Sequence, residues 1–403
     1  MTNLPLDGVR VLDLSSVVVG PYATQFLADY GADVTKIEAP SGDILRKLGG
    51  KSKSGELSPK FMMLNRNKKS LAIDLKNPAA KPLIAKLLAA HDVVLSNIRP
   101  RALARLGLDY ESARAIRPDV IYCSIVGFGQ EGRYKDKPAY DNVIQGVGGI
   151  AACHERQSGT PRFLPMVLAD RLGGLMATQA ILLAVINRSR NDEGQHIEIP
   201  MFENTAAFVL TEHFGQLIYP GSDGPSGDLR VLDKNARPIQ TKDGYICLSA
   251  NSDRQAFALF EAIGHPELKD DPRFDSVTSR YHNIDAYNGL RTEHLQKKTT
   301  TEWIEIFERL DVPAMPYKTF EDLVADPHLN DVGLYQERDH PSEGKVYNLR
   351  PVATFSSIGT KTENLAPRLG EHSADVLASI GVENEEIESL ISDGVILDRP
   401  LDG

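Results

Sequence analysis

The sequence contains little cysteine and none of the common motifs for metal or thiol chemistry. Its 403 residues include three cysteines, Cys123, Cys153 and Cys247, which are far apart. Their spacing matches neither a zinc site nor a disulfide framework, which indicates reduced thiols. No HExxH, CxxC or GxSxG motif occurs, so metalloprotease, thiol-redox and serine-hydrolase functions lack support. We therefore expect no bound metal ion.

An excess of positive charge is also absent. The formal net charge is -10 and the sequence pI is about 5.5, which argues against general binding to nucleic acid or to an anionic membrane. The beginning of the chain lacks the pattern of a secretory signal. The longest apolar run, AILLAVI, is far shorter than the roughly 20 residues of a membrane span. We expect a cytoplasmic protein with no nucleic-acid or membrane partner.

The glycine pattern of a dinucleotide-binding turn is missing as well. The first predicted strand is followed by DLSSVVVGPYATQ, which has a single glycine, Gly20, next to Pro21. The usual turn needs several glycines to let the backbone approach a pyrophosphate, so NAD binding is disfavoured. The GGKS stretch at 49–52 lacks the earlier glycine of a phosphate loop, because position 45 is Leu45. It is interpreted as a mobile basic loop.

The first half of the chain alternates between short apolar segments and amphipathic ones. Such alternation predicts a parallel sheet covered by helices, which is an α/β fold. Strands are expected at 9–14, 33–39, 70–74, 92–96, 120–127 and 196–200.

A turn-rich stretch, PGSDGPSGDLR, marks a change of pattern at 220–230. Beyond it we expect a hairpin with Asp243-Gly244 at its tip, helices at 252–262, 278–297 and 300–310, extended chain at 336–360, and two C-terminal helices. The predicted domains are 1–219, a large domain; 220–330, a small α+β domain; and 331–403, a linker and C-terminal segment returning to the large domain.

One carboxylate, Asp170, stands where an apolar run breaks and a long helix, about 171–188, begins. Aspartate is favoured at helix N-caps, so a structural role explains its position. The free N–H groups of a helix N-terminus also favour an ionised carboxylate. A carboxylate that stays ionised with restricted solvent access is a usable nucleophile toward an activated acyl group. Gly173 and Gly174 allow another backbone or a ligand to approach closely.

Several long motifs resemble the class III CoA-transferases (CaiB/BaiF type), which include formyl-CoA transferase. They are 8-GVRVLDLSSVVVGPYATQFLADYGADVTKIEAPSGD-43, 65-NRNKKSLAIDLK-76, 97-NIRPRALARLG-107, 139-AYDNVIQGVGG-149 and 169-ADRLGGLMATQAILLAVINRSRNDEGQHIEIPMFE-203. The resemblance covers nearly the whole chain, with the motifs in the family's order. It implies a Rossmann-like large domain with an inserted smaller domain, and a homodimer of two interlocked chains.

The resemblance also implies a mechanism. The family's catalytic aspartate falls on Asp170, whose carboxylate attacks an acyl-CoA thioester and is then converted to an enzyme thioester. An acceptor acid attacks in turn, and CoA ends on the new acid. Coenzyme A and acyl-CoA are thus substrates, and no cofactor is bound permanently. The family's CoA contacts map to Val17, Val18, Ile73, Lys76, Asn97, Ile98 and Arg105. Tyr140 and Met201 fall on its active-site positions, where core or wall packing is the alternative explanation.

A cationic patch suits the 3′-phosphate and pyrophosphate of CoA. Lys76 and Arg105 are its candidates, with Arg99 and Arg101 nearby, although either of these last two is as readily explained as a solvated surface charge.

The sequence departs from formyl-CoA transferase at three positions. The segment 249-SANSDRQ-255 lacks the glycine run of the family's loop. Pro138, with Lys137 before it, stands where a CoA-contacting lysine is usual, and Val18 replaces a common glutamine. These changes argue against oxalate as the acceptor and favour a larger or less polar acyl group. The donor and acceptor acids are not determined.

Two other functions fit the same scaffold. An isomerase would be either a racemase or an enzyme that shifts CoA within one dicarboxylate. The related α-methylacyl-CoA racemases pair the aspartate with a histidine, and here Tyr140 stands in its place. A phenol with a pKa near 10 is a poor base at neutral pH, which favours a transferase. An acyl-CoA binding protein without turnover is the third possibility, and Asp170 followed by two glycines argues against it.

Overall fold

The computed structural model describes residues 4–361 and 364–399. The chain forms two compact units. The first comprises residues 1–145, 166–205 and 330–403, and the second comprises residues 146–165 and 206–329. The domains predicted from the sequence, 1–219, 220–330 and 331–403, stay a prediction. Their outermost residues, 1–3 and 400–403, lie outside the described part of the chain.

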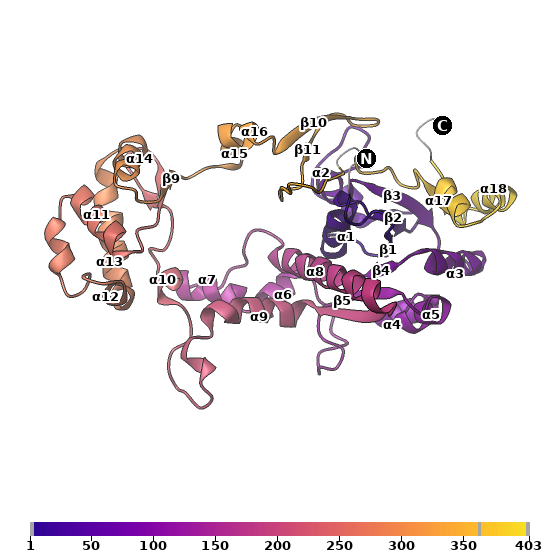
Figure 1. Ribbon diagram of the computed structural model, residues 1–403, viewed down its shortest axis with the longest axis horizontal. Helices are drawn as coiled ribbons and strands as arrows, with labels where there is room; N and C mark the ends of the chain where they lie inside the picture. Colours follow the sequence, from indigo (N-terminus) through magenta and orange to yellow (C-terminus); the bar gives the residue numbers. More distant parts are fainter. Residues whose placement is uncertain (1–3, 362–363, 400–403) are drawn as a thin grey trace. The chain divides into compact units, whose positions relative to one another are not determined.

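The first unit is built on a seven-stranded sheet with the order β12-β3-β2-β1-β4-β5-β6 (Figure 1). Its strands are β1 (Arg10–Asp13), β2 (Asp33–Glu38), β3 (Lys68–Ile73), β4 (Val93–Ser96), β5 (Ile121–Val126), β6 (Gln195–Pro200) and β12 (Ile396–Leu397). The first six are parallel, which confirms the predicted α/β fold, and β12 pairs antiparallel with β3. The direction in which the strands progress reverses between β1 and β4, and doubly wound sheets bind ligands outside the carboxyl ends of the strands at such a point.

Successive side chains of a strand point to opposite faces of the sheet. Because the strands carry apolar side chains on both faces, helices cover both. Leu12 packs into one core and its neighbour Val11 into the other. The Leu12 face is covered by α3 (Lys81–Ala90), α4 (Pro100–Leu106), α5 (Tyr110–Ile116), α17 (Ser373–Ser379) and α18 (Asn384–Ser392). The two C-terminal helices therefore pack on the first unit, which the sequence pattern alone did not decide.

The opposite face is covered by α1 (Val19–Asp29) and α8 (Leu168–Asn191) (Figure 1). α8 is longer at both ends than the predicted 171–188. By length and composition, α8 could cross a membrane, contrary to the expectation that no segment would be long and apolar enough. Core helices meet the same criterion, and α8 contributes Ala169, Ala177, Ile181 and Ala184 to the core that it shares with α1.

A smaller apolar cluster packs against the segment that joins β1 to α1. It comprises Val18, Leu45, Leu57, Phe61, Leu64 and Ala366. The elements around it are the 3-10 helix η1 (Ile44–Lys47) and α2 (Pro59–Asn65). The first unit also contains the hairpin β10 (Tyr335–His340) and β11 (Gly344–Leu349), the short η2 (Pro78–Ala80), and the first residues of α6 (Asp141–Val147) and α9 (Met201–His213).

The second unit has its own core around Trp303, Phe260 and Phe307. The predicted hairpin is confirmed, since β7 (Ile239–Gln240) pairs antiparallel with β8 (Tyr245–Leu248), and β9 (Ala314–Pro316) adds a third strand. Its helices are α7 (Ile150–Ser158), α10 (Leu229–Leu232), α11 (Asp253–Ile263), α12 (Val277–His282), α13 (Ile284–His294), α14 (Thr300–Arg309), α15 (Phe320–Val324) and the first residues of α16 (Pro327–Asp331). It also contains the 3-10 turns η3 (Gly215–Ile218), η4 (Pro266–Asp270) and η5 (Leu295–Lys297). The single helix expected at 278–297 is divided at Asn283 into α12 and α13.

Candidate active site

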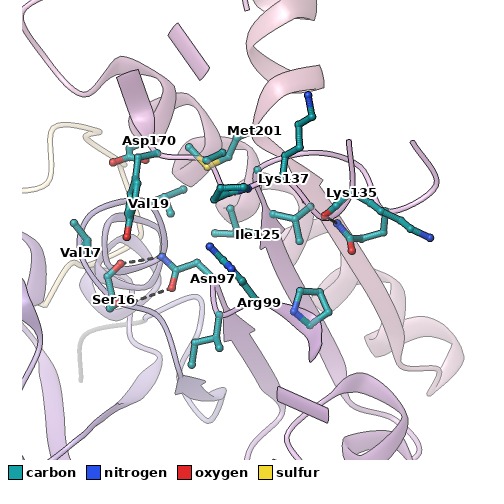
Figure 2. Close-up of a pocket in the computed structure, with 18 of the residues that line it drawn as sticks. Ser16, Val17, Val19, Asn97, Arg99, Ile125, Lys135, Lys137, Asp170 and Met201 are labelled. Carbon is teal, nitrogen blue, oxygen red and sulfur yellow. Dashed lines mark hydrogen bonds between the residues drawn. The ribbon is translucent and has the colours of Figure 1, made fainter. Parts of the chain in front are cut away.

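A cavity of about 610 Å³ lies in the first unit, at the carboxyl ends of β1, β4 and β5. Three segments form most of its wall: the turn Ser16–Val19 after β1, the residues 97–101 after β4, and the segment 125–140 from the end of β5 onward. Asp170 of α8 and Met201 of α9 complete it (Figure 2). The cavity therefore occupies the point where the strand order reverses, where a sheet of this kind binds its ligands.

The sequence-predicted residues fall into two groups. Seven of them line the cavity: Val17, Val18, Asn97, Ile98, Tyr140, Asp170 and Met201. Ile73, Lys76 and Arg105 do not. Ile73 is fully buried at the end of β3, whereas Lys76 and Arg105 are exposed. Their proposed contacts with CoA stay a prediction.

Lys76 follows β3, and the carboxyl end of β3 lies at the same edge of the sheet as the cavity. β3 is two strands from β1, which corresponds to about 10 Å. Arg105 lies in the last turn of α4, the helix that begins at the cavity with Pro100. A ligand as long as CoA could therefore reach either side chain.

Asp170 is the third residue of α8 and does not cap that helix. The N-cap position belongs to Val167, whose side chain makes no capping hydrogen bond. The suggestion that Asp170 is an N-cap is therefore wrong. Burial raises the pKa of Asp170 to about 7, and the negative charge of Asp141 adds to that rise, while Lys60 and Arg171 oppose it. The expectation that the helix terminus keeps this carboxylate ionised is outweighed by desolvation.

The start of α8 is capped by a residue from another helix. The backbone N–H of Asp170 donates to Oδ1 of Asp141, in the first turn of α6, at 3.2 Å. The other carboxylate oxygen of Asp141 accepts from Nε2 of Gln145 at 2.7 Å, and the same Gln145 nitrogen donates to the carbonyl of Met166 at 2.8 Å. Asp141 thus holds the first turn of α8 in place and brings a second carboxylate close to Asp170.

The turn after β1 forms the apolar side of the cavity. Val17 has φ 66, a left-handed conformation that is unusual for a β-branched residue. Asn97 holds the neighbouring Ser16 from both sides: its Oδ1 accepts from the Ser16 N–H at 3.0 Å, and its Nδ2 donates to the Ser16 carbonyl at 2.9 Å (Figure 2). Asn97 therefore acts on the shape of the wall, in addition to any contact that it makes with a ligand.

Met201 and Tyr140 lie on the cavity wall in different surroundings. Met201 is buried where β6 ends and α9 begins, and it packs into the core on the α1 and α8 side. Tyr140 is 79% exposed. The packing explanation therefore holds for Met201 but not for Tyr140, whose ring is free to contact a ligand.

The remaining wall of the cavity carries positive charge. Figure 2 shows Arg99, Lys135 and Lys137 at the cavity. Arg101 also lines it, and all four side chains are exposed. Arg101 pairs with Asp136 at 3.2 Å, and the Lys137 ammonium lies 4.3 Å from the ring centre of Tyr134. Four cations beside one cavity in a protein of net charge -10 provide the local basic pocket that an anionic ligand needs.

The two glycines of α8 allow another backbone, that of α1, to approach. A Cβ on Gly174 would lie 2.7 Å from the Val19 carbonyl oxygen, and one on Gly173 would lie 3.1 Å from Cγ2 of Val19. The glycines therefore set the distance between the helix that carries Asp170 and a segment of the cavity wall.

Two residues near Asp170 were not singled out from the sequence. Asp141 is adjacent to Tyr140 in the AYDNV motif, and its proximity to Asp170 depends on the packing of α6 against α8. Lys60 follows Ser58 and Pro59, which signal only the start of α2. The position of Asp141 within the AYDNV motif was the one sequence signal that could have pointed to it. No sequence signal pointed to Lys60.

Comparisons with known proteins show which proteins this chain is similar to. A model of CoA-transferase family III matches residues 6–373. Succinate–glutarate CoA-transferase of Agrobacterium fabrum is 35% identical over 386 residues, which cover 93% of this chain and 96% of that protein. Human succinyl-CoA:glutarate CoA-transferase is 30% identical over 398 residues, covering 98% and 91%. The crystal structure of a CaiB/BaiF family protein from Brucella suis superposes with a TM-score of 0.80 at 33% identity, covering 94% of this chain and all of that one.

Proposed function

The chain belongs to CoA-transferase family III, and we propose that it moves CoA from an acyl-CoA to a carboxylic acid through a covalent intermediate on Asp170. The observation that carries this proposal is the surroundings of one carboxylate. Asp170 is largely shielded from water in a cavity that has an apolar wall on one side and a cationic wall on the other. Such a site can hold a thioester against the carboxylate and an anionic tail against the cations.

The reaction proceeds in two symmetrical halves. A carboxylate oxygen of Asp170 attacks the thioester carbonyl of the donor, which breaks the C–S bond and forms a mixed anhydride and CoA thiolate. The thiolate attacks the Asp170 carbonyl, which gives an aspartyl-CoA thioester and releases the donor acid. The acceptor carboxylate then attacks that thioester, and the thiolate released attacks the acyl carbonyl of the acceptor. Asp170 is regenerated, and no proton has to be transferred in any step.

Exclusion of water supports this mechanism because each anhydride or thioester would otherwise hydrolyse. Val17, Val18 and Val19 offer an apolar surface beside Asp170, on which the thioester arm would lie. The phosphates of CoA would be held by Arg99, Lys135 and Lys137, and by Lys76 and Arg105 further along the edge of the sheet. Arg101, already paired with Asp136, is a weaker candidate.

We propose succinyl-CoA as donor and glutarate as acceptor. The support is that the human relative is named for succinyl-CoA and glutarate, and the relative from Agrobacterium fabrum for succinate and glutarate. Both acids are dicarboxylates, so the second carboxylate would need a cation close to Asp170. The candidate is Lys60, whose positive charge acts on Asp170 and would attract that second carboxylate.

Trapping the intermediate tests the mechanism. Incubation with succinyl-CoA and no acceptor is expected to leave a CoA or acyl adduct on the peptide that contains Asp170, detectable by mass spectrometry and captured by hydroxylamine. Asp170→Ala should abolish exchange and adduct while CoA still binds in a calorimetric titration. Glu193→Gln, which alters an exposed carboxylate just beyond the other end of α8, is the matched control and should keep both.

Three outcomes would contradict the proposal. An adduct on another residue would move the nucleophile elsewhere. Exchange of the α-proton with deuterated water, with no adduct, would indicate a racemase. Binding of acyl-CoA without either reaction would indicate a binding protein.

A further inference from the structure

The turn that forms the apolar wall of the cavity rests on a cluster of buried charges. This buried ion cluster consists of Asp13, Lys36, Asp43 and Lys68, which are all almost fully buried. Lys36 pairs with Asp43 at 3.1 Å, and Lys68 pairs with Asp13 at 3.1 Å. Its charges therefore balance. None of the four side chains lines the cavity.

The members of the cluster bind the backbone of the turn directly. Lys36 Nζ donates to the Ser15 carbonyl at 2.8 Å, and the Ser15 N–H donates to Oδ1 of Asp13 at 2.9 Å. The Val17 N–H donates to both carboxylate oxygens of Asp43, at 3.1 and 3.3 Å. With Asn97 on Ser16, the backbone of each residue from Ser15 to Val17 is held by a side chain from another segment.

Val17 is the residue that most needs such support. Four described residues other than glycine have positive φ, and the other three, Asn67, Asp192 and Asp311, are types that tolerate it. A β-branched residue in the left-handed region is strained and persists where its surroundings impose that conformation. Asp43 is the side chain that binds the Val17 N–H.

Stability alone gives a weak reason for the cluster. A buried ion pair seldom stabilises a fold more than well-packed apolar residues would. Burial raises the pKa of Asp13, but Lys68, Lys36 and two hydroxyl groups outweigh it and leave the pKa below its usual value. Asp13 is thus ionised at neutral pH. Besides its bonds to Thr24, Leu45, Pro21 and Asn65, the cluster makes four hydrogen bonds to the backbone of Ser15 and Val17, in the turn that forms the cavity wall.

We propose that Asp43 is a positioning residue for the transfer reaction. Its carboxylate holds Val17 in the left-handed conformation. This fixes the position of the apolar cavity wall relative to the carboxylate of Asp170. The inference rests on the proposed function, because it concerns the geometry in which a thioester meets that carboxylate.

A second carboxylate in the same unit serves as a matched control. Asp29 is buried and pairs with Arg66, and its Oδ1 accepts from Nδ2 of Asn67, another left-handed residue. None of these three residues lines the cavity. Asp29→Asn therefore disturbs a buried ion pair and a left-handed residue without touching the turn.

The test compares adduct formation, ligand binding and stability in three variants and the wild type. In Asp43→Ala, the single-turnover rate of adduct formation on Asp170 and kcat should fall about 10- to 100-fold, because misplacement by an ångström has this effect. The Kd for CoA should stay within about threefold, since the cationic wall is untouched. Asp43→Asn, which keeps an acceptor for the Val17 N–H, should lie between this variant and the wild type. Asp29→Asn should lower Tm but leave the rate of adduct formation near that of the wild type.

A double-mutant cycle isolates the role of Val17. Glycine adopts positive φ without strain, so Asp43→Ala should cost a smaller factor in rate in a Val17→Gly background than in the wild type. The inference would be overturned if Asp43→Ala lowered the rate of adduct formation by the same factor in both backgrounds. It would also be overturned if this rate fell in proportion to Tm in the Asp43 and Asp29 variants alike. Either result would leave the proposed function unaffected. Absence of the Asp170 adduct in the wild type would overturn both.

Discussion

At the scale of single residues, the central feature is a proposed nucleophile whose surroundings disfavour its reactive form. Asp170 must be ionised to attack a thioester, yet burial and Asp141 raise its pKa to about 7. The same burial would keep water away from the proposed intermediates. A strongly raised pKa in a cavity is a common property of functional groups, and here it makes both activity and stability depend on pH near neutrality.

The first prediction concerns activity. Because the proposed mechanism requires ionised Asp170, kcat/KM for acyl-CoA should rise about tenfold per pH unit below a midpoint near pH 7 and level off above it. Asp141→Asn removes the like charge while its side-chain oxygen can still accept the Asp170 N–H, so the midpoint should move to lower pH. The measurement is a pH–rate profile of both proteins. An unchanged midpoint in the variant would contradict the assignment of Asp141.

The second prediction concerns stability. A carboxyl group whose pKa is about 7 when folded and 3.8 when unfolded binds more protons in the folded state between these values. The free energy of unfolding should therefore fall as pH rises through this window, by an amount set by about 1.4 kcal/mol per pKa unit. Asp170→Asn cannot ionise, so its Tm should exceed that of the wild type at pH 8 and approach it at pH 4. Thermal denaturation at both pH values checks this, and a lower Tm for the variant at pH 8 would contradict it.

At the scale of secondary-structure elements, the packing of α8 against α1 determines where Asp170 stands. Gly173 and Gly174 bring the two helices close, and Asp141 of α6 caps the first turn of α8. Alanine is favoured over glycine within helices by about 1 kcal/mol. A loss of stability on replacing one of these glycines would therefore report packing, not helix propensity.

The third prediction follows from the atoms that an added Cβ would meet. Gly174→Ala places that carbon 2.7 Å from the Val19 carbonyl oxygen, a backbone atom, and should cost about 1–3 kcal/mol of stability and lower kcat by displacing the wall. Gly173→Ala meets side-chain atoms of Val19 and Met201 and should cost less. Gly289→Ala, in the middle of α13 with nothing within 4 Å, is the control and should raise Tm slightly. A Gly174 variant as stable as the wild type would rule out close packing.

At the scale of the whole molecule, the surface of α8 is notable for its apolar side chains. Leu175, Met176, Leu183 and Ile186 are exposed on the helix whose other face packs in the core. Apolar side chains gathered on one element are typical of a surface that another protein covers. This supports the proposed homodimer, and the interlocking of its chains stays a proposal that follows from the family resemblance.

The fourth prediction tests both the dimer and the interlocking. Sedimentation should give a dimer that persists on dilution to nanomolar concentration, because linked chains cannot separate while folded. Two differently tagged dimers mixed in native buffer should exchange no subunits, and exchange should appear after they are unfolded together and refolded. A monomer would contradict the dimer, and exchange under native conditions would contradict the interlocking alone.

Local patterns in the sequence determined most of the secondary structure. The six parallel strands and the hairpin at Asp243-Gly244 were predicted because their signals lie within a few residues: alternation, short apolar runs and turn residues. β12 was missed because two residues carry no periodic signal. The family resemblance supplied Asp170 and the transfer reaction, and seven of its site residues line one cavity.

The tertiary structure alone decided what Asp170 experiences. The backbone N–H of Asp170 is bound by Asp141, 29 positions earlier in the chain. The pKa of Asp170 depends on burial. The turn Ser15–Val17, on the cavity wall, is bound by the buried side chains of Asp43 and Lys36. Burial and electrostatic interactions act between residues that are near in space but far apart in sequence, so no local pattern records them. The sequence by itself therefore determined which carboxylate is present and on which kind of element, whereas the packing of α1, α6 and α8 decided its charge, its position and its access to water.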